Sequence, residues 1–246
     1  MGTVGTTESL TGLSPRFKAR IAGLLYLIVI VGGIFAEIFV RGRLVVHGDP
    51  AATGHNILTH ELLYRLGFAA EIFYLACNVP LTFIFYDLFK IVNKNVSLLV
   101  VFFSLVGTAV ESVSLLAHAA PLILLNRGHY LSAFTAEQLQ AAAYMSLQLF
   151  EYGFAIALVF FGFYCLCFGY LIFKSTFFPR VIGILLAVEG LMYLTTSFAK
   201  FIAPAIAARV FPYLAASAVA EISLCLWLLV MGVNEKRWKE QASLSV

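Results

Sequence analysis

The sequence predicts an all-α membrane protein, a polytopic bundle of six transmembrane helices with both termini in the cytoplasm. Three observations lead to this fold class. The 246 residues are 61% hydrophobic and only 12% charged, which is about half the charged share of a typical soluble domain. Six apolar runs are long enough to cross a bilayer. Lysine and arginine are distributed unequally among the segments that connect these runs.

Each predicted span has the roughly 20 apolar residues that a helix needs to cross about 30 Å of hydrocarbon. The first run has no small-residue cleavage pattern after it, so we interpret it as a retained span and not as a signal peptide. The second, third and fourth runs exceed the minimum, which indicates tilted helices or ends that project into water. The six spans belong to one integral membrane domain, residues 1–246, and cover residues 17–40, 57–89, 96–125, 137–173, 180–202 and 206–232.

The orientation of the bundle follows from the basic residues outside the spans. Ten lysines and arginines lie in the two terminal tails and in the second and fourth connections. The first, third and fifth connections hold five. Because cytoplasmic segments are enriched in these residues, both termini are predicted to be cytoplasmic.

Charge and cysteine usage exclude several classes of partner and cofactor. A formal charge of +3, with basic residues spread along the edges of apolar runs, does not predict nucleic-acid binding. All four cysteines lie inside apolar runs, where they resemble packing residues more than a disulfide framework or a zinc site. We therefore expect membrane lipid as the main partner and no cofactor, while the sequence leaves the oligomeric state open.

The main functional signal is a carboxylate inside every predicted span. A charged side chain at membrane depth costs several kcal/mol, so it normally faces the bundle interior and has a partner or a proton. Small residues such as Gly67 and Gly107 share a helix face with the nearest glutamate and would let backbones approach closely. The six residues, one on each helix, are Glu37, Glu71, Glu111, Glu151, Glu189 and Glu221. We predict that they form an interior acidic seam.

Depth along the predicted helices suggests an outward-opening polar pocket above a carboxylate floor. The floor consists of the central acids Glu71, Glu111 and Glu151, and the entrance consists of His60, Arg65 and His118. Glu61 precedes Arg65 by four residues, a favourable spacing for an ion pair on one helix.

The charges of this seam do not balance. Within the spans, the only cations counted are Arg65 and Lys200, against seven glutamates when Glu61 is included. Because an uncompensated buried charge is strongly unfavourable, some glutamates must be protonated or must bind a cation.

Three functions remain open from these residues. The leading hypothesis is that the seam binds or conducts a proton, a cation or a small cationic solute. The second is a membrane-embedded metalloenzyme acting on a lipid, with His60, Glu111 and His118 as metal ligands and Glu61 or Glu71 as base. The third is a non-catalytic assembly subunit whose glutamates only connect helices. The chain lacks the H-E-x-x-H and G-x-S-x-G patterns, so enzyme activity is the less favoured interpretation.

Three segments, in this order, resemble one known family. They read ARIAGLLYLIVIVGGIFAE, GDPAATGHNILTHELLYRLGFAAE and FFGFYCLCFGYLIFKSTFFPRVIGILLAVEGLMYL. These segments are similar to the prokaryotic integral membrane proteins grouped as domain of unknown function 4386, over about residues 17–232. The resemblance implies a multi-pass protein of the cell inner (cytoplasmic) membrane. It assigns no catalytic residue to this chain, so the candidate site depends on the acidic seam.

Overall fold

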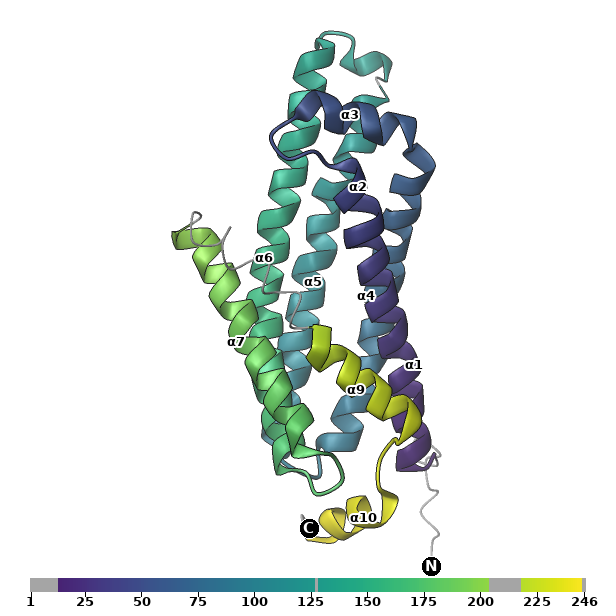
Figure 1. The fold of residues 1–246 in the computed structure, drawn as a ribbon, viewed down its shortest axis with the longest axis vertical. Coiled ribbons are helices and arrows are strands. Elements are labelled where there is room, and N and C mark those ends of the chain that lie inside the picture. Colours follow the sequence, from purple (N-terminus) through teal and green to yellow (C-terminus); the bar gives the residue numbers. More distant parts are fainter. Residues whose placement is uncertain (1–12, 127, 204–217, 245–246) are drawn as a thin grey trace, which may run out of the picture.

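The structure is a computed structural model that describes residues 13–126, 128–203 and 218–244. All regular secondary structure in these residues is helical. Figure 1 shows a long bundle in which α4, α5 and α6 run side by side along most of its length. Over the described part of the chain, the helices confirm the predicted all-α membrane fold class.

The helices follow one another along the chain with short connections. The elements are α1 (Pro15–Ile34), the π-helical η2 (Phe35–Arg41), α2 (Gly42–Leu44), α3 (Pro50–Thr59), α4 (Glu61–Phe89), α5 (Lys94–Leu125), the 3-10 turn η3 (His129–Leu131), α6 (Ala136–Lys174), α7 (Arg180–Ile202), α9 (Ala218–Val230) and α10 (Glu235–Leu244). Among the described residues, five stretches are long and apolar enough to cross a membrane. There are six if α9 and α10, which bend by 102°, count as one span.

The predicted spans agree with these helices except at two places. The first span does not end at residue 40, because η2 and α2 prolong α1 to Leu44. The second predicted span, 57–89, divides at His60 into α3 and α4, so the spanning helix begins at Glu61. The fifth span, 180–202, coincides with α7. Of the sixth span, only 218–230 is helix in the described residues, and 206–217 lies outside them.

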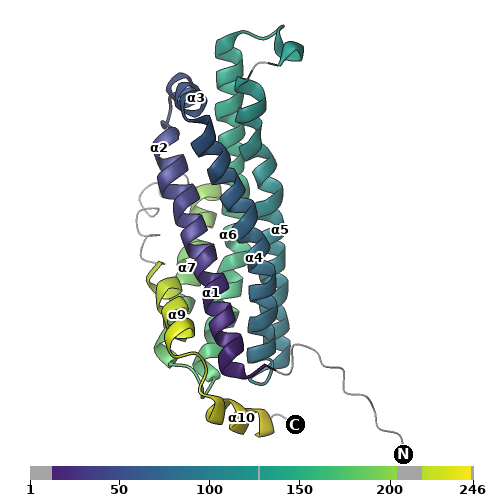
Figure 2. The same ribbon diagram turned by 90° about the vertical axis from the view of Figure 1, so that its right-hand side faces the viewer.

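The two ends of the bundle differ in what they carry. The first turn of α1, the α4–α5 and α6–α7 connections and α10 lie at one end, and α3 lies across the other (Figures 1 and 2). At the first end, the indole N–H of Trp238 on α10 donates to the backbone oxygen of Leu88 at 2.9 Å. Asp49 caps α3 by accepting a hydrogen bond from the backbone N–H of Ala52 at 2.9 Å. The side of the membrane on which each end lies stays a prediction.

Small residues bring the helices close together. A methyl group added at Gly183 of α7 would lie 2.6 Å from the backbone oxygen of Gly169 on α6. A methyl group at Gly67 of α4 would lie 2.8 Å from the side chain of Val40 in η2. Without glycine at these positions the backbones could not approach so closely, as is common between membrane helices. The contact at Gly67 positions the site described next.

Candidate functional site

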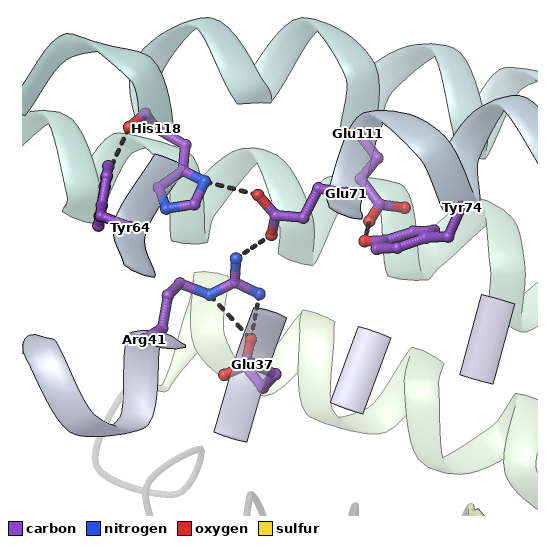
Figure 3. A network of polar contacts seen from close by, with 7 residues as sticks. All are labelled: Glu37, Arg41, Tyr64, Glu71, Tyr74, Glu111 and His118. Atoms are coloured by element: carbon purple, nitrogen blue, oxygen red, sulfur yellow. Dashed lines mark hydrogen bonds and ion pairs between the residues drawn. The ribbon is translucent and has the colours of Figure 1, made fainter. Parts of the chain in front are cut away.

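Glu71 lies at the centre of a charged network between three segments of the chain. Its carboxylate is fully buried on α4 and contacts the guanidinium of Arg41 and, at 2.6 Å, Nδ1 of His118 on α5. Arg41 also pairs with Glu37, with its Nε 3.0 Å from Oε2. Figure 3 shows the carboxylate of Glu71 between the two cationic groups. The prediction of buried glutamates is therefore confirmed at this position.

The close contact between η2 and α4 explains how Arg41 reaches Glu71. Gly67 precedes Glu71 by about one helical turn and packs against Val40, the residue next to Arg41. The segment is π-helical, a geometry often found at functional sites because it redirects side chains. The guanidinium carbon of Arg41 lies 4.8 Å from the centre of the Phe150 ring, which favours a cation there.

His118 is fully buried among aromatic rings. The centres of the Tyr64, Phe68 and Phe150 rings lie 4.9, 6.1 and 4.8 Å from the centre of its imidazole. The Tyr64 hydroxyl donates to the backbone oxygen of His118 at 2.6 Å. Nδ1 is bound to Glu71, whereas Nε2 has no hydrogen-bond partner among the residues the structure describes. One ring nitrogen is thus held in place and the other remains available.

Glu111 is the second buried carboxyl group of the site. It lies on α5 two turns from His118, and the hydroxyl of Tyr74 on α4 donates to it. Figure 3 shows Glu111 turned toward Tyr74 and away from Arg41. No cation is paired with Glu111 in the described part of the chain.

Uncharged polar side chains continue the site along the α4–α5 interface. The amide of Asn78 donates to the hydroxyls of Thr108 at 2.8 Å and Ser104 at 3.3 Å. The hydroxyl of Ser104 lies 2.7 Å from that of Thr82. The distance along α5 from His118 to Ser104 is roughly 21 Å at 1.5 Å per residue. We call the set Glu71, Tyr74, Asn78, Thr82, Ser104, Thr108, Glu111 and His118 the polar track.

The hydrogen bond between Tyr74 and Glu111 gives a first prediction. Tyr74→Phe should lower the free energy of unfolding by about 1–2 kcal/mol, because it leaves a buried carboxyl group without its donor. Tyr170→Phe, at an exposed position of α6, should change it by less than about 0.5 kcal/mol. Denaturant unfolding in detergent micelles measures both values. Equal effects of the two substitutions would contradict the importance of this bond.

The other acids of the predicted seam lie apart from Glu71. Glu151 on α6 pairs with Lys200 on α7 at 3.2 Å, and its side chain is 38% exposed. The hydroxyl of Tyr193 donates to Glu221 on α9 at 3.1 Å, and Glu189 is buried on α7. The seam is thus divided into a Glu71–Glu111 group, a Glu151–Lys200 pair and a Glu189–Glu221 group. Glu151 does not join the central acids.

The residues predicted to form the entrance occupy two different environments. His118 was expected near an opening, but α3 packs over α5 at that end and leaves the histidine buried. His60 lies exposed at the break between α3 and α4. Arg65 pairs with Glu61 at 2.6 Å, as their spacing predicts, and its side chain is 53% exposed.

The metal ligands considered for the second hypothesis do not come together. His118 contacts Glu71, while the ring of His60 lies 3.2 Å from the backbone oxygen of Asn56. In the described ranges, no three histidine, cysteine, aspartate or glutamate side chains gather in a way that could hold a metal ion.

Sequence reasoning missed Arg41 and the two tyrosines. Arg41 was counted in a connection because it ends an apolar run, so the charge balance omitted the cation that pairs with Glu71. The signal was present in its spacing, since Glu37 precedes it by four residues, just as Glu61 precedes Arg65. Tyr64 and Tyr74 carry no pattern that separates them from ordinary aromatic packing residues.

Comparison with known proteins identifies a family. The family model described as Domain of unknown function (DUF4386) matches residues 21–232. This range includes every residue of the polar track. No curated protein and no solved structure matches the chain.

Proposed function

The chain belongs to the DUF4386 family of membrane proteins, and we propose that it transfers protons along the polar track between α4 and α5. Glu71 and His118 form the central proton-exchanging pair, and Glu111 is the second proton-binding group. Arg41 and Glu37 position and balance this pair.

The observation that carries the proposal is the environment of His118. A buried imidazole can accept a proton on one ring nitrogen and release one from the other. Nδ1 of His118 is bound to Glu71, and Nε2 has no partner within the described chain. The surrounding rings of Tyr64, Phe68 and Phe150 keep this nitrogen in an apolar environment. A histidine with only a structural role would more often have both nitrogens satisfied.

The charges favour a proton over a metal cation. When His118 is protonated, Arg41 and His118 balance Glu37 and Glu71. Glu111 then remains without a cation, so we infer that it holds a proton at rest and shares the Tyr74 hydrogen bond. The guanidinium of Arg41 already occupies the position between Glu37 and Glu71 where a bound cation would be expected.

The hydroxyl and amide groups of the track supply the rest of the path. Tyr74, Thr108, Ser104 and Thr82 each carry a hydroxyl that can both donate and accept a hydrogen bond. They extend from Glu111 toward the end of the bundle that carries α10. We propose that this end faces the cytoplasm of a prokaryotic cell, because it carries the larger share of lysine and arginine.

Proton flux in proteoliposomes tests this function. Wild-type protein should dissipate an imposed pH gradient faster than protein-free vesicles, as measured with an internal pH-sensitive dye. Glu111→Gln should slow this flux by roughly tenfold or more, because glutamine keeps the size and hydrogen bonding but cannot release a proton. Asn78→Leu should also slow it, since it interrupts the track without removing a charge.

A matched control separates proton transfer from general damage. Glu137→Gln removes an exposed carboxylate from the first turn of α6, far from the track, and should leave the flux unchanged. If wild-type and protein-free vesicles behave alike, the network has a structural role and the assembly-subunit hypothesis is favoured. Equal flux in Glu111→Gln and wild type would remove Glu111 from the path.

A further inference from the structure

A second feature of the protein lies at the end of the bundle that carries α10, far from the polar track. Ten lysines and arginines of the described chain lie in α10, in the first turns of α1, and at the α4–α5 and α6–α7 connections, with only three acids nearby, Asp87, Glu235 and Glu240. Asp87 already bridges Lys18 at 2.5 Å and Lys90 at 2.6 Å. This end therefore has a large positive excess.

The helix α10 is fixed against this end instead of extending away from it. It bends by 102° from α9, and Trp238 ties it to the end of α4. The side chain of Gln241 accepts a hydrogen bond from the backbone N–H of Thr176 at 2.9 Å. The guanidinium of Arg237 donates to the backbone oxygen of Thr176 at 3.3 Å. A helix held in this way forms the wall of a site.

Two cavities of about 690 and 880 Å³ lie beside α10. Arg16 and Arg237 line the first, and Arg180 and Arg237 line the second, so Arg237 belongs to both. Glu235 contributes to the first lining and Glu240 to the second. The combined linings hold three arginines and two glutamates, which leaves one net positive charge.

The remaining walls are apolar and contain an unused hydrogen-bond donor. Phe177 and Trp227 line the first cavity, and Ile91 and Leu244 line the second. Phe178 contributes to both. The buried indole N–H of Trp227 has no hydrogen-bond partner among the described residues, so it could donate to an oxygen of a ligand.

We propose that these joined cavities bind the headgroup and upper acyl chains of one anionic phospholipid. A phosphodiester carries a single negative charge, which matches the net charge of the linings, and arginine binds phosphate oxygens in a bidentate manner. The apolar walls pack against the acyl chains. Basic pockets at the cytoplasmic ends of membrane helices commonly hold anionic headgroups in this way. A free phosphate ion would leave the apolar walls without a partner.

Native mass spectrometry of the full-length protein tests the site. Purified protein is incubated with phosphatidylglycerol or with phosphatidylcholine of the same acyl chains, and the lipid retained is counted. Wild type should retain phosphatidylglycerol about tenfold better than phosphatidylcholine. The double variant Arg180→Gln/Arg237→Gln should lose this retention by about tenfold, while Arg180→Lys/Arg237→Lys should keep most of it.

The control removes the same charge from the same end of the bundle. Lys236 and Lys239 lie on α10 but line neither cavity, so Lys236→Gln/Lys239→Gln should retain phosphatidylglycerol within about twofold of wild type. Equal losses in both double variants would indicate a diffuse charge effect and overturn the site. Displacement of the lipid by millimolar inorganic phosphate would show a simple anion site instead. Equal retention of both lipids by wild type would overturn the proposal even if the arginine variants fail to fold.

Discussion

Arg41→Gln is expected to lower the free energy of unfolding by about 3–5 kcal/mol, because it removes one partner from a buried ion pair. Glu71 would keep only His118 as a counter-charge, and Glu37 would lose its cation at membrane depth. The measurement is denaturant unfolding in micelles, followed by far-ultraviolet circular dichroism. Proton flux should fall in the same variant, since Glu71 would then take up a proton at rest.

Two further variants make this result specific. Arg43→Gln lies two residues away, is exposed and belongs to no ion pair in the described chain, so it should cost less than about 0.5 kcal/mol. Arg41→Gln/Glu71→Gln should recover part of the lost stability, because the uncompensated charge is then gone. If Arg41→Gln costs no more than Arg43→Gln, Arg41 does not balance Glu71.

The second large effect is expected at the contact between α6 and α7. Gly183→Ala should lower the free energy of unfolding by about 2–3 kcal/mol, because overpacking a close contact forces the backbones apart. The added methyl group would lie 2.6 Å from the backbone oxygen of Gly169 and 2.8 Å from the backbone nitrogen of Phe173. Neither atom can move as a flexible side chain could. Unfolding in micelles measures the loss.

Gly33→Ala provides the matched control for this prediction. A methyl group at Gly33 of α1 would have no neighbour within 4 Å. Alanine should therefore leave the stability unchanged or raise it by up to about 1 kcal/mol, since it favours the helix more than glycine does. Equal destabilisation by the two substitutions would show that glycine is needed for helix geometry and not for the α6–α7 contact.

The sequence predicted most of the spans because hydrocarbon thickness sets a simple length requirement. A helix must supply about 20 apolar residues, and α7 coincides with the fifth predicted range. The break at His60 could not be found in this way. The residues on both sides of it are largely apolar, so hydropathy continues across a turn that the backbone makes.

The candidate site could be predicted only in part for a similar reason. Helical spacing placed Glu71, Glu111 and His118 on inward faces, because these faces depend on residue period alone. The pairing of Arg41 with Glu71 depends on how η2 packs against Gly67, which is a contact between distant parts of the chain. The depth of His118 depends on α3, whose position across the bundle no local pattern encodes.

The π-helical segment at the end of the first span makes its residue count matter as well as its composition. A helix advances by about 100° per residue, so inserting or deleting one residue between Phe35 and Arg41 would swing the guanidinium around the helix axis and away from Glu71. An ordinary membrane anchor tolerates such length variation, because lipid is the same on every side. Here the number of residues before Arg41 is itself part of the design of the charged network.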